Sequence, residues 1–67
     1  MTLPVERTKA VLETRRFLQA LSHASPETVP AEIRLRAETL LRHYPEAIDM
    51  EFAHEKLPQW FGAPDHA

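Results

Sequence analysis

This 67-residue sequence contains no cysteine, one glycine and no long apolar run. Without cysteine it can form no disulfide and offers no thiolate as nucleophile or metal ligand. A single glycine excludes the glycine-rich loops that hold phosphate groups. No apolar segment approaches the roughly 20 residues of a membrane-spanning helix, and the first residues lack the basic start and apolar stretch of a secretory signal. We therefore expect a soluble protein of the cytoplasm.

A chain of this length forms one domain at most. A domain of about 60 residues buries only about 60% of the surface that its unfolded chain exposes, so its stability is marginal. Neither a disulfide nor an evident metal site is present to compensate. Small domains of this kind depend on very good helix packing or on association. The composition therefore favours an oligomer or a complex with another protein.

Proline residues divide the chain into segments of helical length, at Pro4, Pro30, Pro45 and Pro58. Proline is tolerated in the first turn of a helix and pushes the residue before it out of the helical region. With Thr2 as the expected cap, the first helix is predicted over residues 4–23. A second is predicted over 30–44 and a third over 45–56, followed by a tail, 57–67.

Apolar residues recur at spacings of three and four in the first two predicted helices, which is typical of one helix face. In the third, Ile48 and Phe52 share a face, although alternation with Met50 is also compatible with a strand. A lone strand would have no partner, so we prefer the helix. The predicted fold is all-α, an antiparallel helical hairpin with a third short helix and a C-terminal aromatic tail. Its expected core is Val11, Phe17, Leu18, Leu21, Ile33, Ala37, Leu40, Leu41 and Tyr44, with Ile48 and Phe52 closing one end.

A second set of apolar residues breaks these patterns. Leu12 and Leu35 lie nearly opposite the predicted core faces of their helices, and the tail carries Trp60 and Phe61. Aromatic residues are enriched at interface hot spots, so these four residues are the candidate interface. Single exposed leucines are also normal on a monomer, and the tail can instead fold back to cap its own hairpin.

Charge is unevenly placed, with most bases before His43 and most acids after it, for a net charge of −2. This pattern suits self-neutralisation or head-to-tail pairing, and it also suits two ordinary solvated surfaces. The arginines of the two predicted helices are candidate contacts for the phosphate groups of a nucleic acid. They are Arg15, Arg16, Arg34, Arg36 and Arg42. Interleaved glutamates and the long connection between the helices argue against a continuous phosphate-binding stripe.

No reactive centre is recognisable. The four histidines are at least 11 residues apart, which is not the tight spacing of zinc ligands. His43 and Tyr44 adjoin Arg42, but so small a hairpin has little room for a catalytic pocket. We therefore predict no enzyme activity, no catalytic residue, no metal and no cofactor.

Residues 6–18 (ERTKAVLETRRFL) and 40–45 (LLRHYP) together resemble a family of short, uncharacterised proteobacterial helical proteins. The resemblance covers about half of the chain. It implies a bacterial, cytoplasmic setting and, since the family has no assigned activity, no catalytic residues. The leading hypothesis is a small, non-catalytic protein-interaction or adaptor module that acts as a homo-oligomer without contacting a membrane. The alternative is a nucleic-acid-associated regulator that uses the hairpin arginines.

Overall fold

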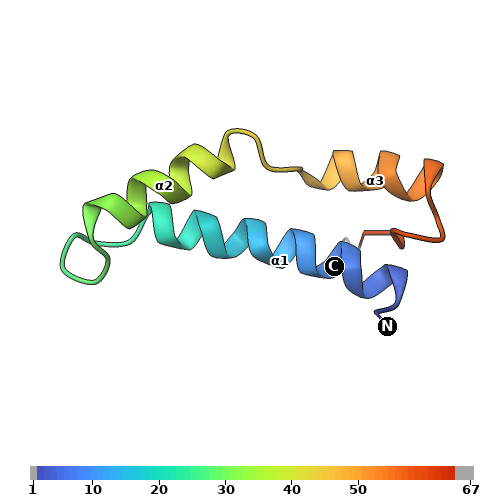
Figure 1. Cartoon of the computed structure of the whole chain (residues 1–67), viewed down its shortest axis with the longest axis horizontal. Coiled ribbons are helices and arrows are strands. Elements are labelled where there is room, and N and C mark those ends of the chain that lie inside the picture. The colour runs from blue at the N-terminus through green and yellow to red at the C-terminus, as the bar shows by residue number, and fades with distance from the viewer. Residues whose placement is uncertain (1, 65–67) are drawn as a thin grey trace. The chain divides into compact units, whose positions relative to one another are not determined.

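The computed structural model describes residues 2–64 (Figure 1). In this range the chain forms the helices α1 (Pro4–Ser22), α2 (Ala31–Leu41) and α3 (Ala47–Lys56), and no strand. The predicted all-α fold with a helical hairpin is thereby confirmed. The strand alternative around Met50 is wrong, because this residue lies inside α3. Residues 65–67 of the predicted tail lie outside the described residues.

The start of α1 depends on local backbone chemistry. Pro4 occupies the first helical position, where a missing N–H costs no helical hydrogen bond. The carbonyl of Leu3 accepts the amides of Glu6 and Arg7, at 3.0 and 3.1 Å. The Glu6 carboxylate in turn accepts the Leu3 amide at 3.1 Å. Leu3, and not Thr2 as predicted, therefore stands at the cap position.

Pro45 determines where α2 ends and α3 begins. α2 stops at Leu41, earlier than the predicted residue 44, because the chain tightens before the proline. The amides of His43 and Tyr44 donate to carbonyls three residues back, at 3.2 and 3.3 Å, as in a 3₁₀ turn. α3 then begins after Glu46, whose amide donates to the Asp49 carboxylate at 2.8 Å. The Glu46 side chain in turn accepts from the backbone amide of Asp49, so the two residues form a capping box. Such a box satisfies backbone donors that the helix start leaves unpaired.

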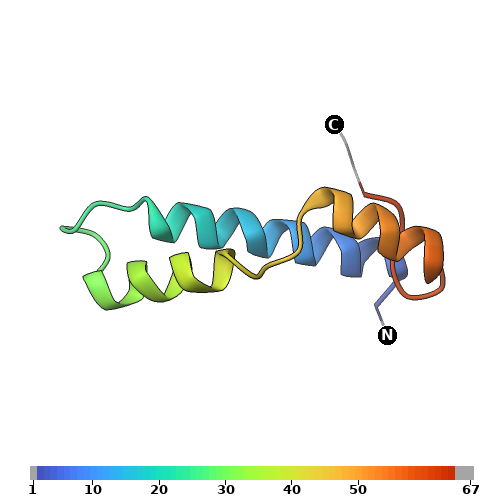
Figure 2. The ribbon, with the colours of Figure 1, turned by 90° about the horizontal axis from the view of Figure 1, so that it is seen from above.

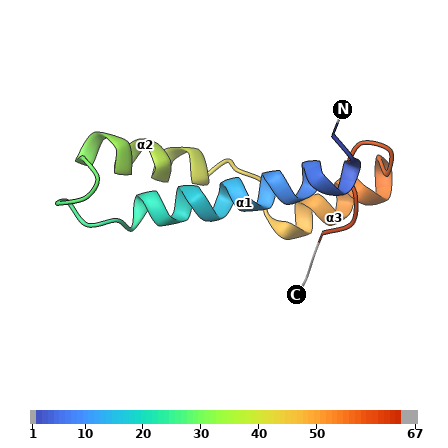
Figure 3. The ribbon, with the colours of Figure 1, turned by 90° about the horizontal axis from the view of Figure 1, so that it is seen from below.

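The chain divides into two compact units that share α1. The hairpin unit, Thr14–Tyr44, contains the second half of α1 and the whole of α2, which run antiparallel side by side (Figure 1). The tail unit contains Met1–Glu13 and Pro45–Ala67. Within its described residues, the segment after α3 returns to the first turns of α1, as Figures 2 and 3 show.

The inward face of α1 is partly polar. Its residues are buried or half-buried and are spaced four and three residues apart, which keeps them on one line along a helix. They are Pro4, Thr8, Val11, Arg15, Leu18 and Ser22. A second line at the same spacing begins with Ala10, Thr14 and Phe17, which are all exposed. The inside of α1 thus includes polar side chains, while Phe17 lies in solvent.

The apolar core is smaller than the sequence predicted. Of the expected core residues, Leu18 and Ala37 are buried, and four others are half-buried: Val11, Leu21, Leu41 and Tyr44. Five are exposed, and for these the prediction is wrong: Phe17, Ile33, Leu40, Ile48 and Phe52. Two packed helices bury only the line along which they touch, so residues beside that line remain in solvent. In α3 the buried residue is Met50, about 200° around the helix from both Ile48 and Phe52.

Candidate interaction surface

The hairpin unit has one apolar and one polar side. Phe17 and Arg36 each stand one residue before the buried residue of their helix, Leu18 and Ala37. Since successive residues are about 100° apart and the two helices run antiparallel, both positions fall on the same side of the hairpin. The residues one position after the buried pair are Gln19 and Glu38, which define the opposite, polar side.

Three large side chains make the first side apolar. Ile33 and Leu40 lie about 40° and 60° from Ala37, in the rotational sense of Arg36. Phe17, Ile33 and Leu40 are 63%, 41% and 58% exposed. We call these three residues, together with Arg36, the apolar side of the hairpin. Large contiguous apolar patches on a protein surface mark interaction sites.

A shallow hollow on α2 adjoins this side. It is lined by Leu35, Arg36, Thr39 and Leu40, and its volume is about 270 Å³. Pockets that bind small molecules usually measure about 300–1,000 Å³ and enclose their ligand. An open hollow on one helix, below that range, is better matched to a single side chain from another helix. Four residues of one helix are also what forms the hole for such a side chain in helix packing.

In the tail unit the chain folds back onto itself. The Gly62 amide donates to the Pro4 carbonyl at 2.9 Å, and the Thr8 hydroxyl donates to the Gly62 carbonyl at 2.8 Å. His54 Nδ1 donates to the Phe61 carbonyl at 2.9 Å. The described part of the tail therefore contacts the first turns of α1 within its own unit, and none of these hydrogen bonds reaches the hairpin unit, which the tail was expected to cap.

The four candidate interface residues are not equivalent. Leu35 is 62% exposed at the hollow and Trp60 is 59% exposed on the tail, whereas Leu12 and Phe61 are half-buried. Trp60 is held by Arg7, whose guanidinium carbon lies 5.4 Å from the ring centroid. The same guanidinium donates to the Trp60 carbonyl at 3.1 Å. Leu35 and Trp60 thus offer more surface to a partner than Leu12 and Phe61.

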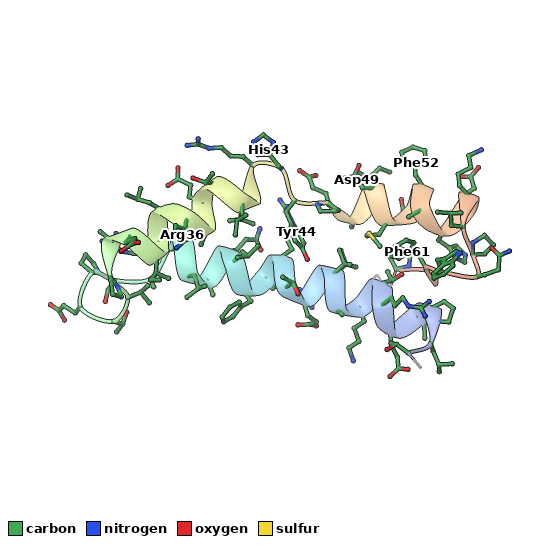
Figure 4. All side chains as sticks on the ribbon, viewed as in Figure 1. Arg36, His43, Tyr44, Asp49, Phe52 and Phe61 are labelled. Carbon is green, nitrogen blue, oxygen red and sulfur yellow. The ribbon has the colours of Figure 1, made fainter. Side chains whose placement is uncertain are left out.

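A further apolar ridge runs along the outer face of α3. Ile48 and Phe52 are four residues apart and exposed, opposite Met50. Figure 4 shows the Phe52 side chain pointing away from α1. Leu3, Val5 and Leu57 are exposed as well. The described part of the chain therefore leaves more large apolar side chains in solvent than it buries.

The candidate nucleic-acid arginines do not converge. Arg15 donates to the Tyr44 carbonyl at 3.3 Å, and Arg34 donates to the Val29 carbonyl at 3.2 Å. Each stands three residues before the buried residue of its helix, about 60° toward the polar side of the hairpin. Arg36 lies on the apolar side.

The two remaining candidate arginines are exposed. Arg42 pairs with Glu38 at 3.2 Å across one turn, and Arg16 lies on α1 about 200° from Leu18. The five side chains thus point in several directions, and two of them, Arg15 and Arg34, donate to backbone carbonyls within the hairpin unit.

The two residues weighed for catalysis, His43 and Tyr44, point in different directions. Figure 4 shows Tyr44 directed toward α1 and His43 directed away from it. Among the described residues, no group of three or more His, Cys, Asp or Glu is arranged to hold a metal ion. Likewise, no helix of residues 2–64 is long and apolar enough to cross a membrane.

The sequence interpretation missed three residues that organise the tail unit. Thr8 is the most buried side chain described, at 1% exposure, and Met50 is buried at the centre of α3. Gly62 approaches α1 so closely that a Cβ in its place would lie 2.6 Å from the Val5 Cα. Its being the only glycine in the sequence was the one signal available for this contact.

No protein family, no curated protein and no solved structure compared with this chain matches it. The resemblance to short proteobacterial helical proteins therefore stays an expectation.

Proposed function

We propose that this protein is a small, non-catalytic interaction module that works by presenting helix surface and that assembles with copies of itself. The observation that carries this proposal is the apolar side of the hairpin, where Phe17, Ile33 and Leu40 stand exposed next to a hollow. Association that removes apolar surface from water is favoured by about 25 cal/mol of free energy for each Å² buried. The expected bacterial, cytoplasmic setting belongs to the same proposal.

Light scattering on a sizing column, over a wide range of protein concentration, tests this function. We expect a particle of at least twice the mass of one chain, with a mass that falls on dilution. Protein and nucleic-acid absorbance are read on the same peak. A particle with the mass of one chain at every concentration contradicts self-assembly.

The absorbance ratio tests the nucleic-acid alternative in the same run. Binding through arginine–phosphate contacts weakens steeply with salt, because counterions are released on binding. Excess nucleic-acid absorbance that disappears at high salt would replace the proposed function with the arginine-based regulator. An absorbance ratio of protein alone at low salt supports the interaction module.

A further inference from the structure

A ring projects from the apolar side of the hairpin unit, and a hollow adjoins this side. Phe17 on α1 is 63% exposed, and the hollow on α2 is lined by Leu35, Arg36, Thr39 and Leu40. Building on the proposed function, we propose that two copies pair through their apolar sides. In this dimer Phe17 of each copy is seated in the α2 hollow of the other.

The first argument is the missing layer. A helix must bury its apolar stripe against another element, and stable domains consist of at least two packed layers. The hairpin unit has a single layer of two helices, with Leu18 and Ala37 as its buried apolar residues. Two such hairpins placed face to face form a four-helix bundle, which is a common way to complete this architecture.

The second argument is self-complementarity. A two-fold dimer uses the same patch on both copies, so that residue i meets j while j meets i. This requires a patch that contains both halves of the contact. The apolar side and the adjoining hollow together meet that requirement, because Phe17 lies on this side and two of the four lining residues, Arg36 and Leu40, belong to it. A second copy of this chain is therefore the occupant that the surface fits.

Charge at the edge of the contact agrees with this pairing. Arg36 lines the hollow. Glu13 lies four residues before Phe17, and hence about 40° away around α1. In the proposed dimer the negative charge of Glu13 and the positive charge of Arg36 both lie at the edge of the contact. Such pairs at the rim of an interface fix register and speed association more than they add affinity.

A matched pair of variants tests the contact. Phe17→Lys and Gln19→Lys each add one positive charge to α1, on opposite sides of Leu18. We expect Phe17→Lys to raise the dimer dissociation constant at least about 30-fold, the effect of losing one interface hot spot. Gln19→Lys should keep the dissociation constant of the unmodified protein, because it lies on the polar side. Sedimentation equilibrium measures both constants.

Mixing provides a second readout that does not depend on one variant staying folded alone. Leu40→Glu damages the hollow and leaves Phe17 intact, so we expect this variant to dissociate as well. In a mixture with Phe17→Lys, one contact has both its native halves and the other brings the two introduced charges together. We therefore expect a mixed dimer from two variants that are each monomeric, detected by native mass spectrometry.

The outcomes separate this inference from the function on which it rests. If the unmodified protein is oligomeric and Phe17→Lys leaves its mass and dissociation constant unchanged, the Phe17 contact is wrong and self-assembly stands. A Gln19→Lys variant that dissociates as strongly as Phe17→Lys also overturns the contact, as does a mixture that forms no mixed dimer. If the unmodified protein is monomeric throughout, both proposals fail.

Discussion

The two units of this chain complete their packing in different ways, although they share α1. In the tail unit, a segment of the same chain returns and is fixed by hydrogen bonds to backbone carbonyls, with Thr8 and Gly62 at the centre. In the hairpin unit, no described segment covers Phe17, Ile33 or Leu40. One unit is thus closed by a segment of its own chain, while the other leaves Phe17, Ile33 and Leu40 exposed among the described residues.

The difference is not one of hydrophobicity. The tail unit also leaves Ile48, Phe52 and Trp60 exposed. The tail unit has, in addition, a hydrogen bond between two residues far apart in the sequence, Thr8 and Gly62. A buried hydroxyl that donates to a carbonyl fixes position and direction, which apolar contacts alone do not.

The largest effect is expected from Met50→Ala. Met50 is buried under α3, so its truncation leaves a cavity and should lower the free energy of unfolding by about 2–5 kcal/mol. Ile48→Ala removes an apolar side chain from the exposed face of the same helix and should change that free energy by no more than about 0.5 kcal/mol. Urea denaturation of both variants provides the measurement. Equal losses would mean that the two faces of α3 do not differ as described.

Gly62→Ala should destabilise the tail unit by about 1–3 kcal/mol, as overpacking does. The added Cβ would lie 2.6 and 2.7 Å from the Val5 Cα and amide nitrogen, and these backbone atoms cannot move as a side chain can. We expect the tail to lift from α1 and the Gly62 amide to lose its protection against hydrogen exchange. Ala63→Gly is the matched control at the exposed neighbouring position. Unchanged protection in Gly62→Ala would show that the close approach is not needed.

Thr8→Val keeps the shape of the side chain and removes the hydroxyl. The Gly62 carbonyl then loses a 2.8 Å hydrogen bond that is partly buried, and a fully buried polar group left unpaired costs about 1–3 kcal/mol. Because part of this carbonyl can turn to water, we expect a loss near the lower end of that range. Thermal unfolding of Thr8→Val, compared with that of the unmodified protein, gives the difference. A Thr8→Val variant more stable than the parent would show that the tail is held by its apolar contacts alone.

The helices and their order could be predicted from the sequence because proline acts locally. Pro4 starts α1, and Pro45 ends α2 three residues early and precedes α3. The inside of α1 could not be predicted, since apolar spacing was the only guide. Thr8 and Arg15 point inward because each finds a carbonyl from a distant part of the chain. The spacing of apolar residues gives no information about these distant carbonyls. Phe17 has helical spacing with other apolar residues, and so the sequence places it in the core, whereas it is exposed.

The candidate interface could be predicted only in part. Leu35, which breaks the helical pattern, and Trp60, an aromatic residue of the tail, are well exposed. The hollow beside Leu35 depends on how four side chains of α2 stand relative to one another, which sequence spacing does not specify. Phe17 was missed as a surface residue for the reason already given. An error in assigning the core thus became an error in assigning the interface.

Phe17→Ala tests the open unit with the smallest expected change in the isolated chain. Since the ring is mostly exposed, its removal at low protein concentration should alter the free energy of unfolding by no more than about 0.5 kcal/mol. At high concentration the unmodified protein gains stability from association and the variant does not, because only a folded chain can pair. The measured cost of the substitution should therefore grow with concentration, while the cost of Met50→Ala stays constant. Unfolding curves at two concentrations a hundredfold apart show this directly. A Phe17→Ala variant that is strongly destabilised even at the lower concentration would mean that the ring is buried within its own chain after all.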